Sequence, residues 1–121
     1  MGFLAVRAGD VYVIVPARLS RGSLARTRIV RFGVIALHPA RAVITIGGGR
    51  RTLVVKATGK RHGQAFVSSS RLALGKALTI RVETTSLVTG KRSTNQRPMP
   101  LVGHVSATLR AQLGLPLPGR G

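Results

Sequence analysis

The chain contains no cysteine and no tryptophan, and only two of its 121 residues are acidic, Asp10 and Glu83. Without cysteine, disulfide bonds and thiolate zinc sites are excluded. Paired carboxylates for general acid–base catalysis would have to be these two residues, which are far apart in the sequence. Carboxylate-based hydrolysis is therefore a poor explanation of what the chain does.

Long hydrophobic runs are also missing. No apolar stretch approaches the roughly 18 residues that a membrane-spanning helix needs, and the apolar residues 3–6 are too few for the core of a signal peptide. Met1-Gly2 opens like a myristoylation site, but Val6 occupies the position where serine or threonine is required. We expect a cytoplasmic protein, or one held within a nucleoprotein particle, with no transmembrane segment.

Positive charge is what the sequence has in excess. Twenty lysines and arginines give a formal net charge of +18, and sixteen of them are arginines spread from Arg7 to Arg120. A hydrophobic content of 44% is normal for a folded domain, so this charge is carried by a globular body and not by a disordered tail. Charges so poorly balanced within the chain indicate an anionic partner, with nucleic-acid phosphates foremost and anionic membranes or polysaccharides as alternatives. A GC-rich genome also raises arginine content and would account for part of it.

Most of the apolar pattern is typical of β-strands. Strands are predicted over residues 11–15, 28–37, 42–46, 52–58 and 77–85, with a further segment at 64–68. The glycine run 47–49 between two apolar segments predicts a hairpin with Arg50 and Arg51 just past its tip. Segment 77–85 alternates almost strictly, which predicts that Thr79, Arg81 and Glu83 face outward while Leu78, Ile80 and Val82 face inward.

The remaining segments are predicted from their glycine and proline residues and from the spacing of their apolar residues. Residues 17–27 are rich in arginine, serine and glycine and are predicted to be a basic loop, and residues 93–100 to be a linker. Apolar residues at positions 101, 105, 109 and 113, between Pro100 and Gly114, favour a helix, although a strand over 102–110 also fits. We therefore expect a mainly β protein: a small antiparallel sheet, sandwich or barrel of about six strands with one C-terminal helix. Residues 1–114 would form a single basic domain and residues 115–121 an extended tail.

No motif for catalysis or cofactor binding is present. The spacing of His38, His62 and His104 matches no local metal-ligand pattern. Neither Gly59-Lys60 nor Gly90-Lys91 is followed by the serine or threonine of a phosphate-binding loop, and no Gly-x-Ser-x-Gly elbow supports a catalytic triad. We expect a protein that is not an enzyme and that has no cofactor and no metal site.

The basic turns are the candidate functional residues. If strands alternate in direction, turns at one end of a sheet lie side by side, and their guanidinium groups and backbone N–H groups could contact phosphates together. Three of the four aromatic residues, Tyr12, Phe32 and Phe66, lie in predicted strands and are expected in the core, so recognition would be of backbone and shape. The predicted nucleic-acid-binding residues are Arg26, Arg28, Arg50, Arg51, Lys60, Arg61, Lys91, Arg92 and Arg97.

Two interpretations follow. The first is a structural protein that binds nucleic acid, with RNA favoured over DNA, as a component of a ribonucleoprotein such as a ribosome or of a viral capsid. Six strands followed by a helix in a small cationic chain resemble the coat proteins of small RNA phages, without any shared motif. The second is a self-assembling β-sandwich with no nucleic-acid role. With short alternating strands and small turns, residues 42–92 resemble immunoglobulin-like modules, but the Cys–Trp–Cys signature of those modules is absent. A homo-oligomer or larger assembly is compatible with either.

Overall fold

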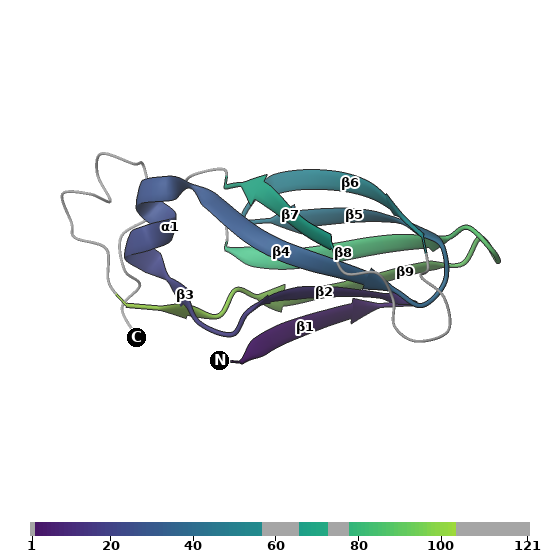
Figure 1. The fold of residues 1–121 in the computed structure, drawn as a ribbon, viewed down its shortest axis with the longest axis horizontal. Coiled ribbons are helices and arrows are strands. Elements are labelled where there is room, and N and C mark those ends of the chain that lie inside the picture. The colour runs from purple at the N-terminus through teal and green to yellow at the C-terminus, as the bar shows by residue number, and fades with distance from the viewer. Residues whose placement is uncertain (1, 57–65, 73–77, 104–121) are drawn as a thin grey trace.

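Two four-stranded antiparallel sheets lie face to face in the computed structural model, which describes residues 2–56, 66–72 and 78–103 (Figure 1). Sheet 1 has the strand order β1-β2-β4-β7 and sheet 2 the order β6-β5-β8-β9. Within the described residues no ladder joins the edge strands of one sheet to those of the other, so the architecture is a sandwich and not a closed barrel. The strands of sheet 1 are β1 (Phe3–Ala8), β2 (Val11–Pro16), β4 (Ile29–Ala36) and β7 (Phe66–Arg71); those of sheet 2 are β5 (Ala40–Ile46), β6 (Gly49–Val55), β8 (Thr79–Ser86) and β9 (Arg92–Pro98).

The core lies between the sheets and is built by alternation along each strand. In β2, for example, Val11, Val13 and Val15 are fully buried, while the residues between them are only half-buried. The same alternation buries Ile44 and Ile46 of β5 in the core, because successive side chains of a strand point to opposite faces. Most of the buried residues are valine, isoleucine and alanine, which suit tightly packed strands.

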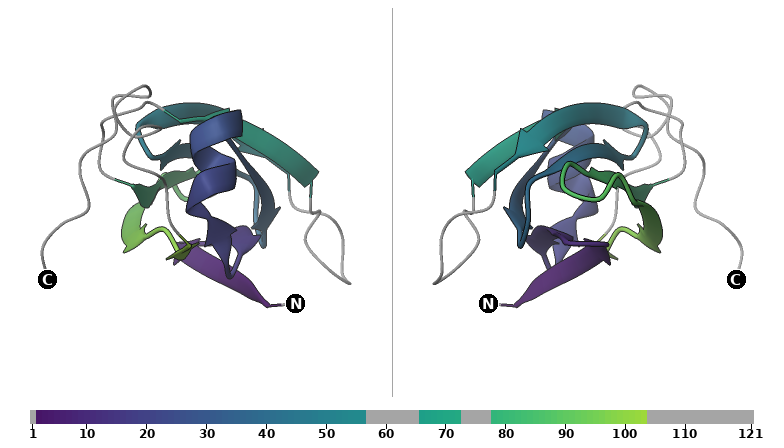
Figure 2. Two further views of the ribbon diagram at one scale, coloured as in Figure 1. Left: turned by 90° about the vertical axis from the view of Figure 1, so that its left-hand side faces the viewer. Right: turned by 90° about the vertical axis from the view of Figure 1, so that its right-hand side faces the viewer.

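One short helix covers an end of the sandwich (Figure 2). Helix α1 (Arg21–Thr27) follows the two-residue strand β3 (Leu19–Ser20), which pairs in parallel with β10 (Leu101–Val102). Ser20 caps the helix by accepting a hydrogen bond from the backbone N–H of Ser23 (3.2 Å), and Leu24 is buried against the core. The prediction of a basic loop over 17–27 was therefore wrong: residues 21–27 form a short helix that Ser20 caps and that buries Leu24 and Ala25.

The β5–β6 hairpin confirms the prediction made from the glycine run. Gly47 and Gly48 form its two-residue turn with φ values of 53° and 86°, a conformation that glycine adopts without steric cost. The strand predicted over 77–85 is also confirmed as β8, with Ile80 and Val82 buried and Arg81 exposed. The predicted strands at 11–15, 28–37 and 64–68 correspond to β2, β4 and β7.

Other predictions about the chain ends were wrong or fall outside the described residues. Residues 93–100 are not a linker, because Arg92–Pro98 form edge strand β9 beside β8. Strand β1, near the N-terminus, was not predicted. Leu101 and Val102 belong to a strand and not to the start of a helix. The rest of the predicted C-terminal helix and the tail 115–121 lie outside the described residues.

The sheets are joined differently along their two open edges. At one edge, β6 approaches β7 so closely that a Cβ on Gly49 would lie 1.8 Å from the carbonyl oxygen of Arg71. At the other edge, side chains of sheet 2 donate to backbone carbonyls of β1: Thr84 Oγ1 to Ala8 (3.1 Å) and Asn95 Nδ2 to Arg7 (2.8 Å). The relative position of the sheets is thus fixed by a backbone contact on one side and by hydrogen bonds on the other.

Candidate nucleic-acid interface

The outer face of sheet 2 carries arginines and threonines. Because Ala42, Ile44 and Ile46 of β5 point into the core, Arg41, Val43 and Thr45 point outward. The alternation in β8 and the pairing registers extend this face across all four strands. The polar residues of this face, called here the Arg/Thr face, are Arg41, Thr45, Arg50, Thr52, Thr79, Arg81, Glu83, Thr85, Arg92, Thr94 and Gln96.

Threonines separate the arginines in the rows that cross the strands. Thr45 pairs with Arg50 on one side and with Arg81 on the other. In a second row, Thr85 lies between Arg41 and Arg92. Neighbouring strands are about 4.8 Å apart, so the arginines of a row stand about 10 Å from one another. This spacing avoids the repulsion of like charges placed directly opposite each other and leaves each guanidinium group open to solvent.

One carboxylate lies among these cations. Glu83 Oε1 is 2.9 Å from Nε of Arg81, and both side chains are about half-exposed. Such a solvent-exposed pair contributes less than about 1 kcal/mol to stability. With Lys56 at the end of β6, the face has five cations (41, 50, 56, 81 and 92) and one acid, which leaves a formal charge of +4.

The predicted binding residues are distributed over several parts of the molecule. Arg50 and Arg92 lie on the Arg/Thr face. Arg51 and Arg97 belong to the edge strands of the same sheet but alternate to its other side, and Arg51 donates to Ser68 Oγ of β7 (3.4 Å). Lys60 and Arg61 lie outside the described residues.

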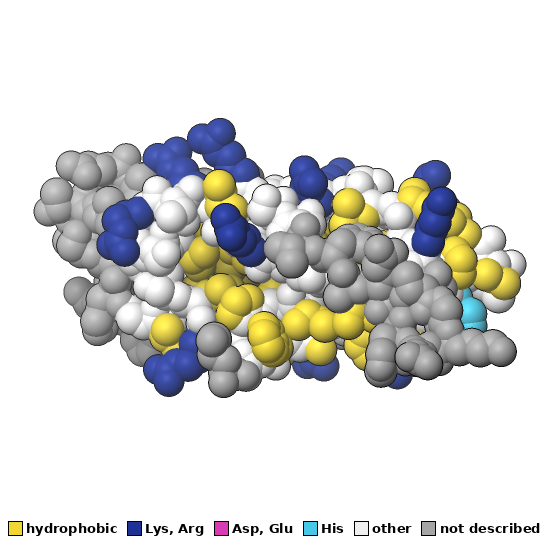
Figure 3. Space-filling model, in the orientation of Figure 1, with side chains coloured by type: hydrophobic (Ala, Val, Ile, Leu, Met, Phe, Trp, Pro, Cys, Tyr) yellow, Lys and Arg dark blue, Asp and Glu magenta, His cyan; other side chains and the backbone are white. Residues whose placement is uncertain are grey.

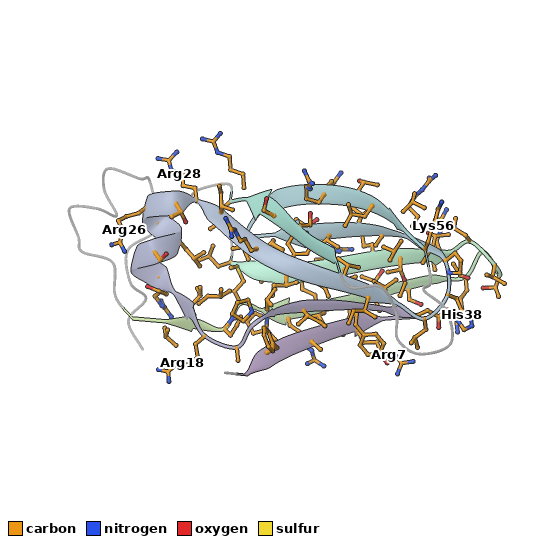
Figure 4. All side chains as sticks on the ribbon, in the orientation of Figure 1. Arg7, Arg18, Arg26, Arg28, His38 and Lys56 are labelled. Carbon is orange, nitrogen blue, oxygen red and sulfur yellow. The ribbon has the colours of Figure 1, made fainter. Side chains whose placement is uncertain are left out.

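The basic turns do not form one patch. Arg26 and Arg28 lie at α1, at the opposite end of the sandwich from Lys56 (Figure 4). Lys91 lies in the β8–β9 turn, and the register of β5 with β8 puts that turn at the end of sheet 2 away from Gly47 and Gly48. The expectation that the turns gather at one end was wrong for the described turns, since antiparallel hairpins of one sheet alternate between its ends.

Three cations of the Arg/Thr face were missed as binding residues, although the sequence contained the signal for two of them. Arg81 was predicted to point outward but was not assigned a role. Arg41 lies one residue before the start of the predicted strand. Because the side chains of a strand alternate, the pattern would have placed Arg41 on the same face as Val43. Lys56 stands directly after β6, and no pattern distinguished it from other lysines.

The outer face of sheet 1 differs in composition. Apolar side chains gather over β1, β2 and β4 in Figure 3. By register, Ala5, Ile14 and Gly33 form one row and Tyr12 and Ile35 lie in the next, while Phe3 is 68% exposed at the edge. Its described cations are Arg7, Arg31 and Arg71.

The aromatic residues are only partly where the sequence predicted them. Phe32 is buried in the core as expected, but Tyr12 is half-buried on the outer face of sheet 1. Phe3, which was in no predicted strand, is exposed. The guanidinium carbon of Arg7 lies 5.2 Å from the centre of the Tyr12 ring. The Arg/Thr face itself contains no aromatic residue, so it offers no ring on which a base could stack.

Few groups with catalytic or metal-binding chemistry come together. No cluster of three histidine, aspartate or glutamate side chains that could hold a metal ion occurs in residues 2–56, 66–72 and 78–103. Asp10 Oδ2 lies 3.3 Å from His38 Nδ1 on the surface. Glu83 is on the outer face of sheet 2, so the two carboxylates do not share a site. Among the described residues, no helix is long and apolar enough to cross a membrane.

A comparison of the chain with protein-family models, with curated proteins and with solved structures finds no match. The surface chemistry of the sandwich therefore carries the argument about function.

Proposed function

We propose that the chain is a non-enzymatic structural protein that binds nucleic acid through its phosphates on the Arg/Thr face. It would act within a ribonucleoprotein or a viral capsid. The observation that supports this proposal is an open four-stranded face with arginines set apart by threonines and a formal charge of +4. Arginine forks form charge-assisted, bidentate hydrogen bonds with phosphate oxygens.

RNA is the preferred partner because of the threonines. Phosphate contacts by arginine do not distinguish RNA from DNA, but a hydroxyl group can both donate to and accept from a ribose 2′-hydroxyl. Thr45 and Thr85 each stand between two arginines, where a sugar would lie if neighbouring phosphates were bound. The absence of aromatic residues from this face favours backbone recognition with little dependence on base sequence.

The experiment compares two triple variants of equal charge. The face variant carries Arg41→Gln, Arg50→Gln and Arg92→Gln. The control variant carries Arg18→Gln, Arg31→Gln and Arg71→Gln, which remove three exposed cations outside the Arg/Thr face. Binding of a fluorescent single-stranded RNA, and of DNA with the same sequence, is measured by polarisation over a range of salt concentrations.

The face variant is expected to bind RNA more weakly by one to two orders of magnitude, on the order of 1 kcal/mol for each lost contact. Its log–log salt slope should fall by about 2, since each single-strand phosphate contact contributes about 0.7. The control variant should lose less than about threefold in affinity. Equal losses in the two variants would show that the whole charged surface, and not this face, attracts the polyanion.

A self-assembling module remains the second candidate, and the apolar outer face of sheet 1 is the observation that favours it. Phe3 and Ile29 are 68% and 47% exposed there, beside the half-buried Ile14 and Ile35. Sedimentation of nuclease-treated protein in high salt distinguishes the two candidates. A discrete oligomer that does not bind RNA would replace the first proposal with the second.

A further inference from the structure

A polar cleft lies between two hairpin turns at the end of the sandwich away from α1. It has a volume of about 210 Å³, and its walls come from the β1–β2 turn and from the β8–β9 hairpin. This volume is several times the share of one water molecule in the liquid, about 30 Å³, and it is below the range of about 300–1,000 Å³ typical of drug-sized ligands. The cleft is therefore suited to a small polar ligand.

Main-chain hydrogen bonds hold its walls in place. The backbone N–H of Leu37 donates to the Asp10 carbonyl (2.8 Å), and that of Leu87 donates to the Pro39 carbonyl (2.9 Å). Within the β8–β9 hairpin, Ser86 N–H donates to the Lys91 carbonyl and Gly90 N–H to the Ser86 carbonyl, both at 2.9 Å. Three turns that are distant in sequence are thus tied together around the cleft.

Hydroxyl groups of the cleft have protons left to donate. Ser86 Oγ accepts hydrogen bonds from the backbone N–H groups of Val88 (3.2 Å) and Thr89 (3.1 Å), and Thr89 Oγ1 accepts one from the backbone N–H of Lys91 (3.3 Å). Because both oxygens act as acceptors there, their own O–H groups remain available as donors. Ser93, which also lines the cleft, adds a third hydroxyl.

Two cations border the same space. Lys91 contributes an exposed ammonium group from the turn. Arg7 is held by a hydrogen bond from Nε to the Gly9 carbonyl (3.0 Å) and by its position over the Tyr12 ring. Its Nη groups have no hydrogen-bond partner among the described residues.

Asp10 is the one lining residue that opposes an anion. Its Oδ2 is 3.3 Å from His38 Nδ1, so part of its hydrogen-bonding capacity is directed to the imidazole. Lys91 and Asp10 carry opposite formal charges, and Arg7 adds a cation whose guanidinium group lies over the Tyr12 ring, in the field of a protein of net charge +18. Donor groups and positive charge therefore outweigh the single carboxylate.

We propose that this cleft binds a phosphate group, with Lys91, Ser86 and Thr89 as its donors. Free inorganic phosphate and the terminal phosphate of a nucleic-acid strand present the same tetrahedral oxyanion, and either could supply it. The proposal does not depend on nucleic-acid binding by the Arg/Thr face, because the cleft lies at the hairpin turns.

Calorimetric titration of the full chain with inorganic phosphate at constant ionic strength tests the site. Lys91→Gln is expected to weaken binding about tenfold, the effect of one lost hydrogen bond to a charged group. Arg31→Gln removes the same charge from the outer face of sheet 1 and is expected to change the affinity less than twofold. Asp10→Asn should strengthen binding about threefold to tenfold, because it removes the opposing charge. Thermal unfolding of each variant checks that the sandwich is intact.

The proposal is overturned if phosphate releases no heat with the wild type, or if Lys91→Gln and Arg31→Gln weaken binding equally. The source of the phosphate is identified by comparing an oligonucleotide that has a 5′-phosphate with the same strand ending in a hydroxyl. A preference for the phosphorylated strand that Lys91→Gln abolishes would point to a strand end. Equal binding of both strands, with phosphate still bound in the titration, would point to the free anion.

Discussion

The outer faces of the two sheets are built from the same kind of strand but present different chemistry. Strand β2 of sheet 1 places Tyr12 and Ile14 on its outer side, whereas β8 of sheet 2 places Arg81 and Glu83 there. Both strands bury an unbroken row of β-branched residues inside. The inner rows are sufficient to form the sandwich, so the outer residues are free to differ.

The two outer faces differ in how their arginines are arranged, although both contain arginine. Arginine occurs on both outer faces, including Arg7 and Arg31 on sheet 1. On sheet 1, Arg7 is engaged with Tyr12 and Arg31 pairs with Ser69, whereas on sheet 2 arginine stands in rows with threonine. A high arginine content from genome composition would raise the number of arginines on both faces, so the number of arginines alone does not distinguish the two faces.

The largest effect is expected at the contact between β6 and β7, which holds the two sheets together along one edge. Gly49→Val would place a branched side chain where even a Cβ lies 1.8 Å from the Arg71 carbonyl oxygen and 2.7 Å from Ser70 Oγ. Separating the backbones of β6 and β7 should lower the free energy of unfolding by more than about 3 kcal/mol. Chemical denaturation measures this loss. Gly2→Ala is the control, because its Cβ would meet only Ala17 at an ordinary 3.5 Å. An equally mild effect of Gly49→Val would contradict the close approach of β6 to β7.

A smaller effect is expected from the acid on the Arg/Thr face. Glu83→Gln removes the pair with Arg81 and raises the charge of the face from +4 to +5. RNA affinity should rise about threefold to fivefold, while the free energy of unfolding falls by less than about 1 kcal/mol. Asp10→Asn makes the same charge change at the β1–β2 turn. With an RNA whose two ends are hydroxyl groups, this substitution should raise the RNA affinity less than twofold. Equal gains in RNA affinity for the two variants would show that RNA does not prefer this face to the rest of the surface.

The smallest effect is expected at Arg28, away from both faces. This residue ends α1 with a φ of 57°, a left-handed conformation that costs an arginine roughly 1 kcal/mol more than a glycine. Arg28→Gly should therefore raise the free energy of unfolding by about 0.5 kcal/mol, with RNA affinity changed less than twofold. Parallel denaturation and polarisation measurements check both values. A loss of affinity as large as that caused by Arg50→Gln would assign binding to the α1 end as well.

The sequence predicted the interior of the fold better than its edges. Strands β2, β4, β5 and β8 have neighbours on both sides and carry strong β-branched patterns, and all four were predicted. Edge strand β9, with the sequence Arg-Ser-Thr-Asn-Gln-Arg-Pro, has no apolar period, and among the described strands it pairs with β8 alone. Helix α1 has only two buried residues, Leu24 and Ala25, too few for a helical period. Both elements depend on tertiary contacts that a local pattern does not contain.

The candidate site was predicted by residue type and not by position. Arginine pairs in turns drew attention to Arg50 and Arg92, which do lie on the Arg/Thr face, but the same rule also selected Arg26 and Arg28 at α1. Bringing Arg41 beside Thr85 and Arg92 requires the pairing order β5-β8-β9, which joins segments about forty residues apart in the sequence. Strand order of this kind is set by the packing of the whole core.

The most direct test of the account is an NMR titration of the amide-labelled protein with a short single-stranded RNA. If the Arg/Thr face is the binding surface, the largest shifts should fall on β5, β6, β8 and β9, centred on Thr45 and Thr85, with β1 and β2 nearly unchanged. Shifts of similar size on both sheets, or shifts confined to the outer face of sheet 1, would contradict it.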